Sequence, residues 1–345
     1  MNKLYWFNPE NDLALAAGHG RYTPPRVAVE LRRGGALLPS LWSDGSDLIL
    51  GPDSESIVSN PALIPEPWGW SVYTRDRFLR AGCCADMLPS DDSLLLMRLL
   101  SHRRTSLAVL RELGFAQENL PVEATTVEGA FLAIDFFGGD AVVKLPWSCS
   151  GRGVFYAAAM KRPQLESVIR GGIARQGSVM VERRFDRIRD FAMLFRAEPK
   201  GVSFRGISVF ATDDSGNYSG NLIASQEILL ERLGIDPLSL IPAIERALNA
   251  VVAGNYTGWL GVDMMVYRDE GNHNAIHPCI EVNLRMTMGV AALLAAENGR
   301  LPWENAILRV ALPGEMISSD VISLSSVPPE RNKPIAHPVI VVAPL

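Results

Sequence analysis

Cysteine and long apolar runs are both scarce in this chain of 345 residues. Its 4 cysteines include no CxxC pair, and their spacing matches neither a zinc site nor a disulfide framework. No apolar run reaches the ~18 residues that cross a membrane, and polar residues from Asn8 onward interrupt the apolar start before it has signal-peptide length. We therefore expect a protein of the reducing cytoplasm with no membrane partner.

An excess of positive charge is missing as well. Lysine and arginine total 33 against 38 aspartates and glutamates, a formal net charge of −5, and no long run of like charge occurs. Binding to a nucleic-acid backbone needs clustered basic residues, so nucleic acid is not an expected partner. The length allows two domains or slightly more, with a sizeable core, and is ordinary for an enzyme.

The polar residues that suggest chemistry concentrate in residues 280–285. Three polar side chains occupy alternate positions there, with apolar residues between them, as in a half-buried strand. Alternate residues of a strand share a face, so Glu281, Asn283 and Arg285 are predicted to project together.

A second strand-like run, residues 259–267, precedes this segment, and a polar turn region, residues 268–274, separates the two. This order predicts a β-hairpin. If the hairpin folds symmetrically about Asn272, Asp263 lies directly opposite Glu281.

Two carboxylates in this cross-strand position are about 5 Å apart and repel each other, so both stay ionised only with a cation between them. Oxygen ligands from Asp263, Glu281 and Asn283 suit Mg²⁺, which binds few protein carboxylates and completes its shell with water and nucleotide phosphates. The alternative is a solvent-facing hairpin whose charges pair with nearby arginines.

Polar residues also follow the first predicted strand, residues 4–7. In open α/β sheets ligands bind beyond the carboxyl ends of strands, which makes four residues substrate-site candidates. They are Asn8, Glu10, Asn11 and Asp12. A turn followed by a helix cap explains the same residues. Further short strands at 48–50 and 71–73, and a helix at 27–33, predict a small α/β domain over roughly the first 95 residues.

Two more strand-like runs, residues 140–146 and 153–157, flank a loop rich in serine and glycine, residues 147–152. Such a loop brings backbone N–H groups close to phosphate oxygens, and Lys144 supplies a countercharge. The spacing of a P-loop is absent, and a flexible surface hairpin is the alternative interpretation.

Taken in order, five segments resemble the ATP-grasp superfamily of ATP-dependent carboxylate–amine ligases, over roughly residues 96–300. The segments are 101–105, 142–144 with 148–153, 179–182, 258–263 and 281–285. The resemblance implies an α/β (α+β grasp) chain, in which a small Rossmann-like N-terminal domain precedes a two-lobed ATP-grasp domain. The implied limits are 1–95 and 96–345, with a lid lobe at about 119–181, a metal-binding lobe at about 182–315 and a C-terminal strand at 336–345.

The resemblance also implies site residues. The implied ATP-binding residues are Arg103, Lys144, Ser148, Ser150, Gly151, Gly153, Glu182 and Asp190. Asp263, Glu281 and Asn283 would hold Mg²⁺, or Mn²⁺ in its place. Lys144 would contact the phosphates, and Arg285 would steady the transferring phosphoryl group or the acyl phosphate. Arg103 stands where many members of the superfamily have a lysine.

The implied function is an ATP-dependent ligase that activates a small-molecule carboxylate as an acyl phosphate, which an amine or similar nucleophile attacks. Catalysis of this kind rests on positioning and charge neutralisation, in agreement with a candidate set of cations, metal ligands and backbone donors. Two alternatives remain at this point. One is a non-catalytic ATP-binding protein with a degenerate site, and the other is a phosphotransferase acting on a hydroxyl.

Overall fold

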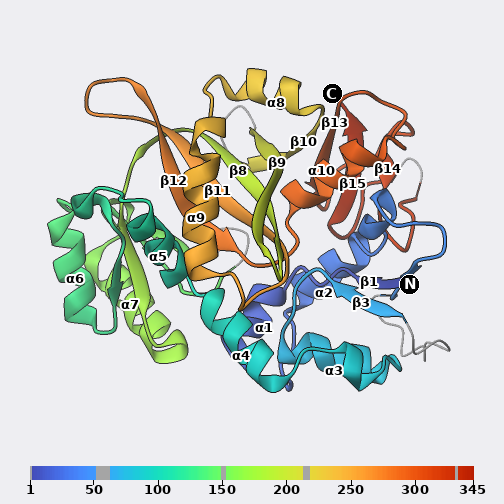
Figure 1. Cartoon of the computed structure of the whole chain (residues 1–345), viewed down its shortest axis with the longest axis horizontal. Helices are drawn as coiled ribbons and strands as arrows, with labels where there is room; N and C mark the ends of the chain where they lie inside the picture. The colour runs from blue at the N-terminus through green and yellow to red at the C-terminus, as the bar shows by residue number, and fades with distance from the viewer. Residues whose placement is uncertain (1, 52–62, 149–152, 213–217, 331–332) are drawn as a thin grey trace.

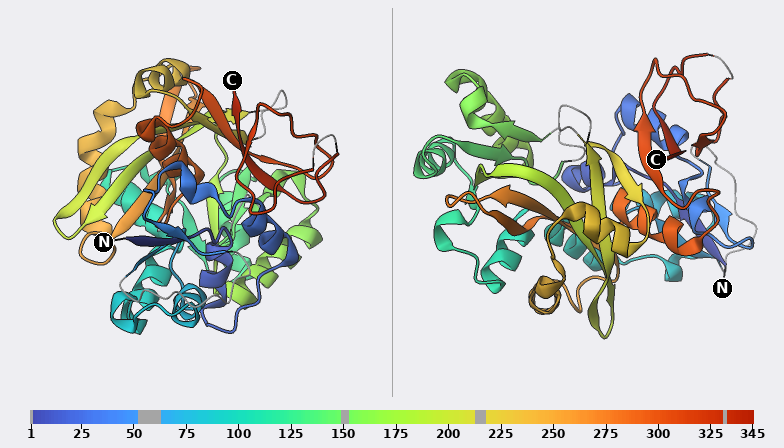
Figure 2. Two further views of the ribbon diagram at one scale, coloured as in Figure 1. Left: turned by 90° about the vertical axis from the view of Figure 1, so that its right-hand side faces the viewer. Right: turned by 90° about the horizontal axis from the view of Figure 1, so that it is seen from above.

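The computed structural model describes residues 2–51, 63–148, 153–212, 218–330 and 333–345. These residues form three sheets of 3, 8 and 4 strands. Figure 1 shows the large sheet at the centre, with the four-stranded sheet and its helices on one side and the N-terminal segment on the other. In the view from above in Figure 2, the four-stranded sheet lies at the opposite end of the molecule from both termini.

The N-terminal sheet is parallel, with strand order β2-β1-β3. Its strands are β1 (Lys3–Trp6), β2 (Leu48–Ile49) and β3 (Ile64–Pro67). Helix α3 (Val72–Arg80) covers one face, where Leu4 and Trp6 pack against Phe78. The predicted α/β character of this segment is confirmed, whereas the Rossmann-like assignment and the domain limits stay predictions.

One predicted strand is wrong. Residues 71–73 begin helix α3, because the Ser71 side chain accepts the backbone N–H of Thr74 and caps the helix. The strand lies earlier, at β3, where two prolines disguise it. Proline is tolerated there because β3 is an edge strand of its sheet.

The eight-stranded sheet is antiparallel throughout, in the order β12-β11-β8-β9-β10-β13-β15-β14. Its strands are β8 (Asp186–Glu198), β9 (Gly201–Thr212), β10 (Tyr218–Ile223), β11 (Gly258–Arg268), β12 (Asn274–Asn283), β13 (Ala306–Ala311), β14 (Ile322–Ser323) and β15 (Val339–Pro344). Helices cover both faces of its central strands, so β8 is apolar on both sides and its residues Phe191 to Phe195 are buried.

Two groups of helices flank these strands. On one face, α5 (Arg104–Glu112), α8 (Gln226–Leu233) and α9 (Ile241–Val251) pack their apolar residues into the largest core. On the other, α10 (Met288–Asn298) packs Val290 and Leu293 against Leu194 of β8. The predicted end of α10 at Gly299 is confirmed, since this residue has φ 62° and forms a left-handed C-cap.

The four-stranded sheet has the order β4-β7-β5-β6. Its strands are β4 (Val122–Ala124), β5 (Ala141–Lys144), β6 (Val154–Tyr156) and β7 (Val179–Arg183), with helices α6 (Val127–Phe136) and α7 (Arg162–Gln176) packed on it. The remaining helices are α1 (Asn11–Ala17), α2 (Arg26–Gly34) and α4 (Asp91–Leu100). Among the residues described, no helix is both long and apolar enough to cross a membrane.

The predicted β11–β12 hairpin is confirmed in its register. Asp263 pairs with Glu281, and Gly261 pairs with Asn283. Between Asp263 and Met265 the pairing shifts by two residues, because Met265 pairs with His277. The irregularity leaves the carboxylate pair where simple symmetry about Asn272 had placed it.

Helix α2 of the N-terminal segment packs against the start of β15, the strand of the large sheet that comes last in the sequence. A Cβ atom built on Gly34 would lie 1.9 Å from the carbonyl oxygen of Pro338, just before β15. Only glycine permits this approach of two backbones.

Gly34→Ala is therefore expected to lower the free energy of unfolding by about 1–3 kcal/mol, since either the helix or the strand must shift. Gly45→Ala is the matched control, because nothing lies within 4 Å of its added Cβ. Urea denaturation of both variants measures the difference. Equal stability of the two variants would contradict the close packing of α2 on β15.

Candidate active site

The cross-strand carboxylates lie within a connected polar cluster. The Nδ2 group of Asn283 donates to Oδ2 of Asp263 at 3.0 Å. Arg103 Nη1 lies 2.8 Å from Glu281 Oε2. One carboxylate of the pair thus has a guanidinium partner, whereas Asp263 has no ion-pair partner among the described residues.

Arg103 connects this cluster to the four-stranded sheet. It lies at the start of α5, and its side chain is only 7% exposed. Besides Glu281, it donates to the carbonyl oxygen of Leu145 at 2.9 Å and to Ser148 Oγ at 3.0 Å. A single guanidinium therefore ties the end of β5 and the start of the serine–glycine loop to a candidate metal ligand.

Burial and the neighbouring charge of Glu281 both favour the protonated form of Asp263. Burial, followed by the charge of Glu281, raises the pKa of Asp263 from 3.8 to about 7. The positive charge of Arg285 and the hydrogen bond from Asn283 act in the opposite direction but do not compensate.

Arg285 is held by a residue from the other end of the chain. Its Nη2 donates to Asp12 Oδ2 at 2.7 Å, and its Nε lies 3.1 Å from both oxygens of that carboxylate. Asp12 sits in the first turn of α1, just after β1. The contact brings one predicted substrate-site residue to the predicted catalytic arginine.

The other three N-terminal candidates turn away from this contact. Asn8, Glu10 and Asn11 are each 1% exposed. Asn8 donates to the carbonyl of Gly69 at 2.9 Å, and Glu10 forms a buried ion pair with Arg32. Their contacts are those of a buried turn, as the alternative interpretation expected, but Glu10 at the N-cap of α1 forms no side-chain cap hydrogen bond. A substrate role for these residues stays a prediction.

Two of the predicted nucleotide-side residues meet on the four-stranded sheet. Lys144 of β5 donates to Glu182 of the neighbouring strand β7, and both side chains are largely buried. Asp190 lies in β8 of the large sheet, where it pairs with Arg187 at 2.7 Å. Burial raises the pKa of Asp190, while the charges of Arg187 and Lys144 oppose that rise.

The base of the serine–glycine loop is closed tightly. Leu145 donates its backbone N–H to the carbonyl of Gly153 at 2.8 Å, and a Cβ on Gly153 would lie 2.5 Å from Cβ of Ser148. Glycine is thus required at 153 by close approach. Ser150 and Gly151, also predicted to bind ATP, lie outside the described residues.

An aromatic group near Lys144 was not predicted from the sequence. His277 of β12 is 4% exposed and lies between the rings of Phe115 and Phe185, at 4.7 and 4.9 Å. Burial and the charge of Lys144 lower the pKa of His277 to about 3, so the ring is neutral. The signal was its place in β12, an even number of residues before Glu281 and hence on the same face in a regular strand.

The candidate metal site, formed by Asp263, Glu281 and Asn283, offers oxygen donors. Within the described ranges, no group of three or more His, Cys, Asp or Glu side chains is placed to hold a metal. The candidate set has two carboxylates and one amide, and one of the carboxylates, Asp263, has no ion-pair partner among the described residues. Few protein ligands and hard oxygen donors fit Mg²⁺ that also binds phosphate, so the residues fit the ion.

Comparison with known proteins gives the fold. No protein-family model matches the chain, and no curated protein matches its sequence. Biotin carboxylase of Campylobacter jejuni, solved as a β,γ-ATP complex, has 14% identity and TM-score 0.54 over 99% of this chain and 87% of its own. Carboxyaminoimidazole ribonucleotide synthase of Aspergillus clavatus, complexed with ATP, has 12% identity and TM-score 0.53 over 100% and 94%.

A third structure agrees with these two. The biotin carboxylase domain of Hydrogenobacter thermophilus 2-oxoglutarate carboxylase, with MgADP, ADP and bicarbonate, has 12% identity and TM-score 0.50 over 72% of this chain. This chain spans 62% of that protein's length. These likenesses show the fold alone: the chain has the ATP-grasp fold, and the predicted mixed α/β class is confirmed.

The raised pKa of Asp263 predicts a pH effect on stability. In metal-free solution the folded protein keeps this proton up to about pH 7, whereas the unfolded chain loses it near the ordinary value of 3.8. The folded state binds more protons in that window, so the contribution of Asp263 to stability falls as pH rises through it. Asp263→Asn removes this contribution, and urea denaturation across the window should show the variant gaining stability relative to wild type as pH rises. A difference independent of pH would contradict the raised pKa.

Proposed function

We propose that this protein is a Mg²⁺-dependent ATP-grasp ligase that activates a small-molecule carboxylate as an acyl phosphate for attack by an amine or a similar nucleophile. The observation that carries the proposal is the paired Asp263 and Glu281, joined by Arg103 to the strand that bears Lys144. Metal-type ligands and phosphate-type cations are thus linked within one cluster. The relatives of the same fold, solved with ATP or MgADP, support this assignment.

On the nucleotide side, Lys144 and Arg103 would bind the phosphates, with Ser148 at the base of the loop. Lys144 now pairs with Glu182, so nucleotide binding separates the two. Lys144 then turns to phosphate oxygens, and Glu182 becomes free to accept hydrogen bonds from the adenine amino group. Asp190 would contact the ribose, and it lies near enough to Lys144 for that charge to oppose the rise of its pKa.

On the metal side, Asp263, Glu281 and Asn283 would hold the ion. Asn283 donates to Asp263 through Nδ2, which leaves its Oδ1 available as a ligand. Mg²⁺ bound there neutralises charge on the phosphates and orients them. The same charge would return the pKa of Asp263 to the range in which the carboxylate is ionised.

At the reacting end, Arg285 would bind the negative charge that develops on the transferring phosphoryl group and the acyl oxygen. Asp12 fixes the guanidinium through three close N–O contacts and leaves Nη1 bonded only to the carbonyl of Met286. We assign Asp12 as a positioning residue. Because Asp12 follows β1, the N-terminal segment would also lie beside the small-molecule carboxylate that is to be activated.

The first test is nucleotide binding. Calorimetry with a non-hydrolysable ATP analogue and Mg²⁺ should show binding, and Lys144→Ala should weaken it at least tenfold, or about 1.4 kcal/mol, through the lost phosphate contact. Lys161→Ala is the matched control, because Lys161 is an exposed lysine on the same lobe. Folded wild-type protein that binds no analogue at ~1 mM would rule out the proposal.

The second test concerns turnover and the metal ligands. An ATP-hydrolysis screen against pooled amino acids and small carboxylic acids, with products identified by mass, finds the substrate pair. With that pair, Asp263→Asn should lower turnover at least ~100-fold, because a charge that stabilises the transition state is lost. Asp269→Asn, in the turn of the same hairpin, should leave turnover unchanged.

Melting temperatures measured without metal separate metal binding by these carboxylates from a purely structural role. Glu281→Gln should lower the melting temperature because it leaves Arg103 without its carboxylate, whereas Asp263→Asn should not. Products phosphorylated on a hydroxyl, or ATP binding without any turnover, would favour a phosphotransferase or a non-catalytic binding protein instead.

A further inference from the structure

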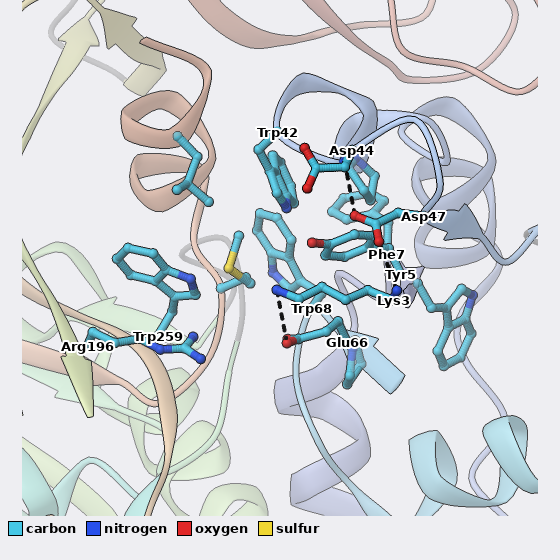
Figure 3. A pocket seen from close by; sticks show the side chains of 15 residues that line it. Lys3, Tyr5, Phe7, Trp42, Asp44, Asp47, Glu66, Trp68, Arg196 and Trp259 are labelled. Carbon is cyan, nitrogen blue, oxygen red and sulfur yellow. Dashed lines mark hydrogen bonds and ion pairs between the residues drawn. The ribbon is translucent and has the colours of Figure 1, made fainter. Parts of the chain in front are cut away.

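A separate cavity of about 360 Å³ lies between the N-terminal sheet and the large sheet. Figure 3 shows Lys3, Tyr5 and Glu66 on one side of it and Arg196 and Trp259 on the other. Helix α3 covers one face of the N-terminal sheet, and Tyr5 and Phe7, which alternate with Leu4 and Trp6 along β1 and just beyond it, line the cavity on the other face. Its volume is within the range of small-molecule sites.

The cavity is distinct from the candidate active site. Trp259 and Asp263 lie on the same face of β11, but only Trp259 lines the cavity. Between them, a Cβ on Gly261 would contact Thr287 at 3.4 Å and Leu194 at 3.7 Å, so packed side chains fill this space. None of the predicted ATP- or metal-binding residues lines the cavity.

Aromatic rings form much of its wall. Of the 7 tryptophans in the chain, the wall includes Trp6, Trp42, Trp68 and Trp259. Trp42 meets the ring of Tyr5 edge-on at 6.1 Å, and Trp68 meets Phe7 edge-on at 5.0 Å. Such rigid walls bind flat or apolar groups at little entropic cost, and their faces attract cations.

One side of the cavity is acidic. Asp44, Asp47 and Glu66 line it, against a single lysine, Lys3. Lys3 pairs with Glu66 at 3.5 Å, and both side chains are partly exposed, at 41% and 31%. Burial, and then the charges of Asp47, Glu66 and Asp44, raise the pKa of the Tyr5 hydroxyl.

The other side carries a cation that forms no ion pair with the described residues. Arg196 of β8 lies over the ring of Trp259 at 5.5 Å, and it has no ion-pair partner within the part of the chain that the structure describes. Figure 3 shows its guanidinium beside Trp259, facing the N-terminal sheet. A half-buried guanidinium without a carboxylate is a ready partner for an anionic ligand group.

We propose that this cavity is a second binding site, which takes a small zwitterion of the amino-acid class with an apolar or aromatic side chain. Its carboxylate binds Arg196, its ammonium group faces Asp47 and Glu66 on the other side of the cavity, and its side chain packs between Trp42, Trp68 and Trp259. The two charged sides and the aromatic wall each match one part of such a molecule. This site does not depend on the proposed ligase function.

The test is calorimetry of the full chain with each of the twenty L-amino acids at ~10 mM, which saturates a site with a Kd near 1 mM. At least one with an apolar or aromatic side chain should bind. For the tightest binder, its amide (no carboxylate) and its N-acetyl derivative (no ammonium group) should each bind at least tenfold more weakly.

Variants locate the binding. Arg196→Gln should weaken the amino acid at least tenfold and remove its advantage over the amide, and Glu66→Gln should weaken it relative to the N-acetyl derivative. Arg205→Gln is the matched control, because Arg205 also lies over Trp259, at 5.7 Å, without lining the cavity. It should leave affinity unchanged.

Three results would overturn the site: no amino acid binds, Arg196→Gln and Arg205→Gln behave alike, or a non-hydrolysable ATP analogue with Mg²⁺ displaces the ligand competitively. The last result would place the ligand in the candidate active site. Failure of ATP binding itself would reject the proposed function and leave this test intact, since the two ligands occupy different cavities.

Discussion

Repulsion between Asp263 and Glu281 is the constraint around which the candidate active site is arranged. Cross-strand pairing holds the two carboxylates together, and the fold distributes their charge unequally. Glu281 is neutralised by Arg103, while Asp263 relies on Asn283 and on keeping a proton. The remaining negative charge lies at the Asp263 carboxylate, and a divalent cation bound there would neutralise it directly.

The charged contacts around this point connect parts of the chain that are distant in sequence. Arg103 links the helical region after α4 to the hairpin, and Asp12 links the end of β1 to Arg285. Lys144 and Glu182 neutralise each other within the four-stranded sheet. Each cation proposed to bind phosphate, namely Arg103, Lys144 and Arg285, therefore already has an anionic partner. Ligand binding exchanges one set of charge pairs for another and does not have to bury new charge unaided.

The sequence predicted what depends on local periodicity. Alternating residues gave the β11–β12 hairpin and its carboxylate pair, because a one-residue slip would expose the buried face and is strongly disfavoured. Contacts across the fold could not be predicted, since Arg103–Glu281 and Asp12–Arg285 depend on how whole elements pack. Strand β3 was missed because prolines conceal an edge strand, and the aromatic cavity arises only where two sheets meet.

Strand β15 has a consequence for how the protein is made. It lies between β13 and β14, and its residues Ile340 and Val342 share one buried cluster with Phe7 and Leu38 from the start of the chain. During synthesis, the N-terminal segment emerges from the ribosome long before this partner exists. The apolar surface of the N-terminal segment stays uncovered until β15 has left the ribosome, so this part of the core forms late in synthesis.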